Sequence, residues 1–305
     1  MSGKEWKPLA AGRWSADTAE RQALKPCPPN RAQQMLIDFA RQSPLKRGVF
    51  RASVSRMVFA LGRGPIDIAF RDAVFRLEGG RNLIEYGILL NSAYNQEDID
   101  FLGAVLAPDA VSGAGHASGP VIVDVGCNIG LYSLPLARIT GPQGRCISID
   151  ANPMMTARLM RNAALSGLAS ITAFACAVSD RDGSGSLAVR KNDDAIVAVV
   201  ENDEGPIPVR TLLSVLTEAS IERIDALKID IEGHEDKALV PFLDQAPPAL
   251  LPRRIVIEHP EPDRDYEGCA SAFARHGYRL IGRSRNNSLY ELHKRAVQPS
   301  DHSAS

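Results

Sequence analysis

The region after residue 117 alternates short apolar segments with helical ones, and this pattern constrains the fold more than any other feature of the chain. Strands are predicted at 121–125, 146–149, 171–178, 226–229 and 254–258, with helices at 130–139 and 153–165. Such alternation folds into a parallel sheet covered by helices on both faces. Two final segments, 278–281 and 288–292, predict an antiparallel hairpin at one edge. The fold class is therefore α/β, with a Rossmann-like, mostly parallel sheet of seven strands.

The N-terminal third of the chain does not follow this alternation. It predicts a helix, a β-ribbon that pairs 73–77 with 83–90 across Gly79 and Gly80, a second helix and a linker of small residues. The expected divisions are a disordered tail over 1–30, an extension with its linker over 31–116, a ligand-binding domain over 117–295 and a disordered tail over 296–305.

A glycine-containing loop follows the first strand of the alternating region, where a doubly wound sheet binds ligands. Gly126 allows a tight turn close to a ligand, and Gly130 permits close packing of the following helix. Asp124, at the strand end, can accept hydrogen bonds from loop amides or, through water, from a cationic amino group. Asp150 ends the next strand, where an acid commonly binds ribose hydroxyls, although it could instead cap the next helix.

The spacing of this loop distinguishes between nucleotide ligands. A nicotinamide-binding loop has the pattern G-x-G-x-x-G, in which the middle glycine lets a pyrophosphate lie against the backbone. Asn128 stands at that position, so the pattern is D-x-G-x-x-x-G and suits a nucleoside without a pyrophosphate. S-adenosylmethionine is such a nucleoside, whereas a nicotinamide dehydrogenase is disfavoured.

Several stretches of the chain are shared with a known family. They are the loop at 123–133, Ala177-Val-Ser-Asp180 with Gly183, the run at 207–212 and Leu227-Lys-Ile-Asp-Ile-Glu-Gly-His-Glu235. On these residues, and over about 90–292, the chain resembles the FkbM family of S-adenosylmethionine-dependent methyltransferases. The resemblance implies the class I methyltransferase fold with an N-terminal extension, and residues 1–89 lie outside it.

The resemblance also implies a cofactor site and an activity. It implies that S-adenosylmethionine is held by Asp124, Gly126, Asn128, Gly130 and Asp150, and that the backbone at Ala177 borders the adenine. Family members typically methylate hydroxyl groups of sugars, polyketides or other secondary metabolites, so an O-methyltransferase with a small-molecule or carbohydrate acceptor is expected. Two alternatives stay open: a non-catalytic binding module that keeps the fold, and a methyltransferase that acts on nitrogen or on a macromolecule.

Charged residues interrupt the strand at 226–229 and its continuation. Lys228 and Asp230 stand two residues apart, so they share one face of the strand. Because a central parallel strand is buried on both faces, two charges there need a partner or a function. Either they form an ion pair that fixes the strand end, or Asp230 acts as a base or orients the acceptor hydroxyl. Glu232, His234 and Glu258, at the end of the next strand, complete the candidate catalytic set.

The same carboxylates raise the question of a metal. Asp230, Glu232 and Glu258 could together hold Mg²⁺, as carboxylates do in some O-methyltransferases. Their spacing does not follow a dedicated metal motif, so no metal is predicted.

Composition limits the partners and the location. Residues 1–90 carry 15 basic and 8 acidic residues, whereas the rest carries 20 and 28. No Lys/Arg run has the density of a basic-patch motif, so packing of the basic part on the acidic domain is favoured over binding of nucleic acid or a membrane surface. The five cysteines form no C-x-x-C pair, and neither a secretory signal nor a membrane span is evident. A cytoplasmic protein is therefore expected.

Overall fold

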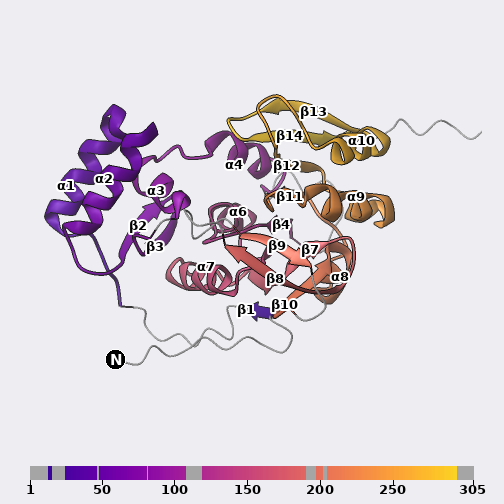
Figure 1. Cartoon of the computed structure of the whole chain (residues 1–305), viewed down its shortest axis with the longest axis horizontal. Coiled ribbons are helices and arrows are strands. Elements are labelled where there is room, and N and C mark those ends of the chain that lie inside the picture. Colours follow the sequence, from indigo (N-terminus) through magenta and orange to yellow (C-terminus); the bar gives the residue numbers. More distant parts are fainter. Residues whose placement is uncertain are drawn as a thin grey trace, which may run out of the picture.

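The computed structural model describes residues 13–15, 25–46, 48–80, 82–107, 119–189, 197–201 and 205–293. Most of the predicted tail over 1–30, the linker that ends at 116 and the tail over 296–305 lie outside these residues. Figure 1 shows a central sheet with α1 (Arg31–Gln42) and α2 (Gly48–Ala60) at one end of the molecule.

The central sheet has eight strands in the order β1-β6-β5-β4-β11-β12-β14-β13. Strands β6, β5, β4, β11 and β12 are parallel, and β14 and β13 form an antiparallel hairpin at the edge. This order confirms the predicted α/β class, with a mostly parallel sheet and an antiparallel hairpin at its edge. The eighth strand, β1, pairs antiparallel with β6 and was not predicted. The bounds are β1 Arg13–Ser15, β4 Val121–Val125, β5 Arg145–Asp150, β6 Ile171–Ala175, β11 Ala226–Ile229, β12 Arg254–Glu258, β13 Tyr278–Arg283 and β14 Asn287–Leu292.

Helices cover both faces of the sheet and bury two apolar cores. One core joins the sheet to α6 (Ser133–Thr140), α7 (Pro153–Leu165) and the N-terminal extension. The other joins it to α8 (Leu212–Glu218), α9 (Glu235–Gln245) and α10 (Glu267–His276). None of the described helices is long and apolar enough to cross a membrane.

The N-terminal extension, here residues 25–107, has a different ribbon from the predicted one. β2 (Ile66–Phe70) pairs with β3 (Ala73–Leu77), and the segment predicted as the partner of β3 is instead helix α3 (Leu83–Leu90). That prediction was wrong because residues 85–90 are buried on all sides, and an apolar run of that kind has the same appearance in a helix and in a strand. Helix α4 (Gln96–Gly103) follows and corresponds to the second helix predicted for the extension.

The predicted strand at 171–178 is two strands in two sheets. β6 ends at Ala175, and β7 (Ala177–Ser179) begins a small sheet of order β7-β10-β8-β9. Its other members are β8 Gly183–Val189, β9 Val197–Glu201 and β10 Ile207–Thr211. The break between β6 and β7 leaves Cys176 and Ala177 at the carboxyl edge of the central sheet.

Candidate functional site

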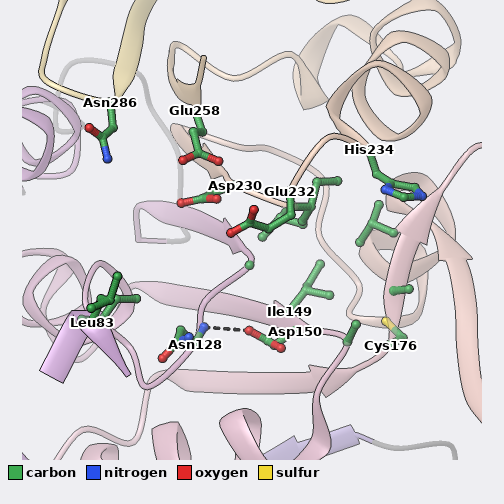
Figure 2. A pocket seen from close by; sticks show the side chains of 17 residues that line it. Leu83, Asn128, Ile149, Asp150, Cys176, Asp230, Glu232, His234, Glu258 and Asn286 are labelled. Atoms are coloured by element: carbon green, nitrogen blue, oxygen red, sulfur yellow. Dashed lines mark hydrogen bonds between the residues drawn. The ribbon is translucent and has the colours of Figure 1, made fainter. Parts of the chain in front are cut away.

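A cavity of about 290 Å³ lies at the carboxyl ends of β4, β5, β11 and β12. Parallel strands bring their carboxyl ends to one edge, so side chains far apart in the sequence meet there. Figure 2 shows two regions of this pocket: Asp150, Ile149 and Cys176 lie on one side, and Asp230, Glu232 and Glu258 lie on the other. The first is called the nucleoside end below, and the second the acidic end.

The nucleoside end combines one carboxylate with apolar walls. Asp150 accepts hydrogen bonds from the backbone N–H groups of Asn128 and Asn152, both at 2.8 Å. A carboxylate oxygen has two lone pairs, so Asp150 keeps acceptor capacity for hydroxyl groups in the pocket. Burial raises the pKa of this carboxyl to about 6. With Ile149, Cys176, Ala177 and Val178 as apolar lining, this end fits a ribose and a base.

Gly126 lies where the loop after β4 crosses the end of β11. Its φ is +80°, and a Cβ there would lie 1.8 Å from the carbonyl oxygen of Asp230. The N–H groups of Gly126 and Cys127 both donate to the carbonyl of Ile149, at 2.8 and 3.0 Å. Only glycine therefore lets this loop lie so close to the end of β11 at the edge of the pocket.

Three of the predicted site residues lie behind the pocket wall. Asp124 is fully buried and accepts a hydrogen bond from the hydroxyl of Ser133. At Gly130 an added Cβ would lie 2.2 Å from Cδ1 of Leu134, which indicates a packing role. The other predicted cofactor residues, Gly126, Asn128, Asp150 and Ala177, line the pocket.

Lys228 is the third predicted site residue that does not line the pocket, and its buried side chain forms an ion pair with Asp230. Its side chain is 2% exposed, and its Nζ lies 3.3 Å from Oδ2 of Asp230. The ammonium also donates to the carbonyl of Ile229 and lies 5.2 Å from the ring centroid of Tyr132. Lys228 therefore orients the Asp230 carboxylate without reaching the cavity.

The acidic end brings together carboxyl groups from three elements. One oxygen each of Asp230, Glu235 and Glu258 lies within 4.8 Å of the others. Burial first, and then the charge of Asp230 and a hydrogen bond to it, raise the pKa of Glu258 well above its usual range. The raised pKa favours the protonated form of Glu258, whose O–H can donate to Asp230. Glu232 and His234 line the same part of the pocket.

Glu235 was not predicted as a site residue, and it replaces Glu232 in the close carboxylate group. Its side chain is fully buried at the first position of α9, and it accepts from the N–H groups of Ile231 and Gly233, at 2.8 and 2.9 Å. The sequence signal that could have identified Glu235 is its place in the first turn of a helix, where a carboxylate can accept hydrogen bonds from free backbone N–H groups. Its carboxylate shapes the turn that carries Glu232, whose φ is +56°.

Of the other lining residues, none of which was predicted, three lie far in sequence from the loops that carry the predicted site. Leu83 and Ile84 come from α3 of the extension, and Asn286 comes from the turn before β14. They lie more than 35 residues from the loop of β4 in sequence, and the contacts of such residues carry no local signal.

Several known proteins are similar to this chain. The model of the methyltransferase FkbM domain matches residues 124–280. Methyltransferase sdnD of Sordaria araneosa is 31% identical over 182 residues, which are 48% of this chain and 68% of that protein. The 23S rRNA (uracil(1939)-C(5))-methyltransferase RlmD of Paraburkholderia xenovorans is 27% identical over 132 residues, 37% of this chain and 27% of that protein. Among solved structures, M. jannaschii TYW2 in complex with AdoMet has a TM-score of 0.39 at 14% identity, covering 76% of this chain and 88% of that one.

The family match spans the loop of β4, Asp150, both strands of the acidic end and α9. It confirms the resemblance drawn from the sequence motifs and the expected cofactor. The chain belongs to the FkbM family of methyltransferases, whose methyl donor is S-adenosylmethionine.

Proposed function

We propose that this methyltransferase transfers the methyl group to a hydroxyl oxygen of an uncharged or cationic small molecule, such as a sugar or another hydroxylated metabolite. The observation that carries the proposal is the Asp230–Glu258 pair at the acidic end. If the nucleoside end takes the adenosine, the acceptor enters beside these two carboxyl groups. An ionised carboxylate there can accept the proton of a hydroxyl that attacks the methyl group.

The charge of the pocket supports this acceptor class. Among the described residues that line it, four are acidic and none is lysine or arginine: Asp150, Asp230, Glu232 and Glu258. A phosphate group would be repelled here, whereas proteins that bind nucleic acids neutralise phosphates with basic side chains. The pocket therefore favours an uncharged or cationic acceptor over RNA, although RlmD is an rRNA methyltransferase.

The proposed chemistry assigns a different role to each of Asp230, Lys228 and Glu258. When bound, S-adenosylmethionine supplies an electrophilic methyl group on its sulfonium. Asp230 accepts the hydroxyl proton of the acceptor, while Lys228 holds its carboxylate at 3.3 Å. Protonated Glu258 donates a hydrogen bond to Asp230 and so fixes its orientation. The apolar walls limit water at the nucleoside end.

The test is transfer of a labelled methyl group to a panel of acceptors. The panel contains neutral sugars, amino sugars, hydroxylated polyketides, sugar phosphates and ribosomal RNA. We expect label in the neutral or cationic hydroxy compounds. Label only in sugar phosphates or RNA would contradict the proposal.

Replacing Glu258 with glutamine is expected to have little effect. The amide is neutral, as protonated Glu258 is at pH 7, and its NH₂ group can still donate to Asp230. Turnover of an acceptor identified in the panel should stay within roughly threefold of the parent value. A loss of about a hundredfold or more in this variant, together with full turnover in Asp230→Asn, would assign the base to Glu258 and not to Asp230.

Cofactor binding should weaken in acid because Asp150 binds hydroxyls only as a carboxylate. Its pKa of about 6 lies above the ordinary value, so it is ionised above pH 6 and becomes protonated below it. The Kd of S-adenosylhomocysteine, measured by calorimetry from pH 5 to 8, should be constant above pH 7 and rise by up to about tenfold per pH unit below 6. In Asp150→Asn the Kd should be higher throughout and lose this pH dependence. The same dependence in the variant would assign it to another group.

A further inference from the structure

The side chain of Asn82 connects the N-terminal extension to the loop after β4. It is 2% exposed and immediately precedes α3. Its Oδ1 accepts from the N–H of Ile84 at 2.9 Å and so caps the helix, while its Nδ2 donates to Oδ1 of Asn128 at 2.8 Å. The two ends of one amide thus hold a helix of the extension and a residue of the pocket.

The hydrogen bonds continue from Asn128 to Asp150. Asn128 has a φ of +47°, in the left-handed region that few residues other than glycine adopt. Its side-chain oxygen also accepts from the N–H of Ile129, at 2.8 Å, which helps to hold this conformation. Its own N–H then donates to Oδ2 of Asp150 at 2.8 Å. Substitution of Asn82 can therefore alter the hydrogen bonding of the Asp150 carboxylate through one intermediate residue, Asn128.

A buried ion pair fixes α3 in this position. Glu85 of α3 is fully buried, pairs with Arg158 of α7, and accepts from the N–H groups of Glu78 and Gly79 at 3.1 and 2.9 Å. Removing one member of such a pair leaves an uncompensated buried charge, so the helix resists displacement. Because α7 begins three residues after Asp150, this pair links α3 to the same element that follows the nucleoside end.

A second asparagine makes a parallel connection. Asn162 of α7 accepts from the N–H of Arg76 in β3 at 2.9 Å and donates to the carbonyl of Ile129 at 3.0 Å. The loop after β4 is therefore connected to the extension twice, directly by the hydrogen bond from Asn82 and indirectly through Asn162. Leu83 and Ile84, the first two residues of α3, line the pocket, and Figure 2 shows Leu83 beside Asn128.

We infer that the extension is a working part of the cofactor site, in which Asn82 is a positioning residue for Asn128 and Asp150 and α3 forms one wall of the pocket. The family match begins at residue 124 and does not include this helix. The inference rests on the proposed role of Asp150 in binding the ribose.

The test compares Asn82→Ser with a matched helix-cap variant, using S-adenosylhomocysteine so that no acceptor is needed. Serine keeps the cap of α3 but is too short to reach Asn128. We expect about tenfold weaker binding. The pH midpoint of binding should also move upward, because the hydrogen bond from Asn128 lowers the pKa of Asp150, against the charges of Asp124 and Asp230. A merely structural role would not move this midpoint.

The control is Asn30→Ala, which removes the equivalent cap of α1, where Asn30 accepts from the N–H of Gln33. It should lower the Tm and leave both the affinity and the pH midpoint unchanged. Unchanged binding and midpoint in Asn82→Ser would overturn the inference. If Asp150→Asn also binds as well as the parent protein, the proposed role of Asp150 in binding the ribose fails. If Asp150→Asn loses binding and Asn82→Ser does not, only the role of Asn82 is wrong.

Discussion

Asp230→Asn is expected to slow methyl transfer by about 10²- to 10⁴-fold, the range typical for loss of a general base. Asparagine has nearly the same shape, so the pocket keeps its form, but a neutral amide cannot accept the acceptor's proton. Binding of S-adenosylhomocysteine should stay within roughly twofold, because this ligand lacks the sulfonium charge that a carboxylate could attract. The measurement is single-turnover transfer to an acceptor found in the panel, with calorimetry alongside.

The contrast between Asp230→Asn and Glu258→Gln makes this prediction specific. Both changes replace a carboxyl with an amide in the same carboxylate group, and only Asp230 is assigned the proton. Equal losses in the two variants would indicate a general packing or charge effect. A parent protein that binds the cofactor, transfers no methyl group to any acceptor and is unaffected by Asp230→Asn would fit the binding-module alternative.

The second large effect is expected at Gly126. In Gly126→Ala the new Cβ would lie 1.8 Å from the carbonyl oxygen of Asp230, so the loop and the end of β11 must separate. Left-handed strain costs about 1–2 kcal/mol for a residue with a Cβ, and overpacking adds about 1–3 kcal/mol. The free energy of unfolding should fall by about 2–5 kcal/mol. Affinity for S-adenosylhomocysteine should fall at least about tenfold, because both separated segments line the pocket.

Gly167→Ala is the matched control. Gly167 also has a positive φ, +66°, but an added Cβ there would have no atom within 4 Å. It should therefore lose only the strain contribution, about 1–2 kcal/mol, and keep its affinity. Equal destabilisation in the two variants, measured by urea unfolding, would mean that the contact with Asp230 does not matter.

Much of the fold could be predicted because the strands of the central sheet are short, apolar and separated by helical segments. The strands β4 and β5, the start of β6 and the hairpin of β13 and β14 follow from such local patterns. The failures have a physical cause. Residues 85–90 of the run at 83–90 are all buried, so the periodicity of this run could not reveal a helix. The strand at 171–178 changes sheets at Cys176, and no local pattern marks that change.

The site was partly predictable for a different reason. Asp150 and Glu258 end parallel strands, and Asp230 directly follows one. Because the carboxyl ends of parallel strands lie at one edge of a sheet, the sequence predicts that these three side chains meet there. The pocket residues Leu83 and Asn286 come from the extension and from the edge hairpin, and only the three-dimensional packing brings them there. The protonation of Glu258 likewise depends on its burial and its distance from Asp230, which the sequence does not contain.

The most direct test of the proposed function is the identity of the atom that receives the methyl group. The protein would be incubated with S-adenosylmethionine carrying a carbon-13 methyl group and with the acceptor panel, and the product would be analysed by NMR. We predict a methyl carbon bonded to oxygen in a neutral or cationic hydroxy compound, and its absence in Asp230→Asn. A methyl carbon bonded to nitrogen or carbon, or label confined to RNA, would contradict the proposed O-methyl transfer.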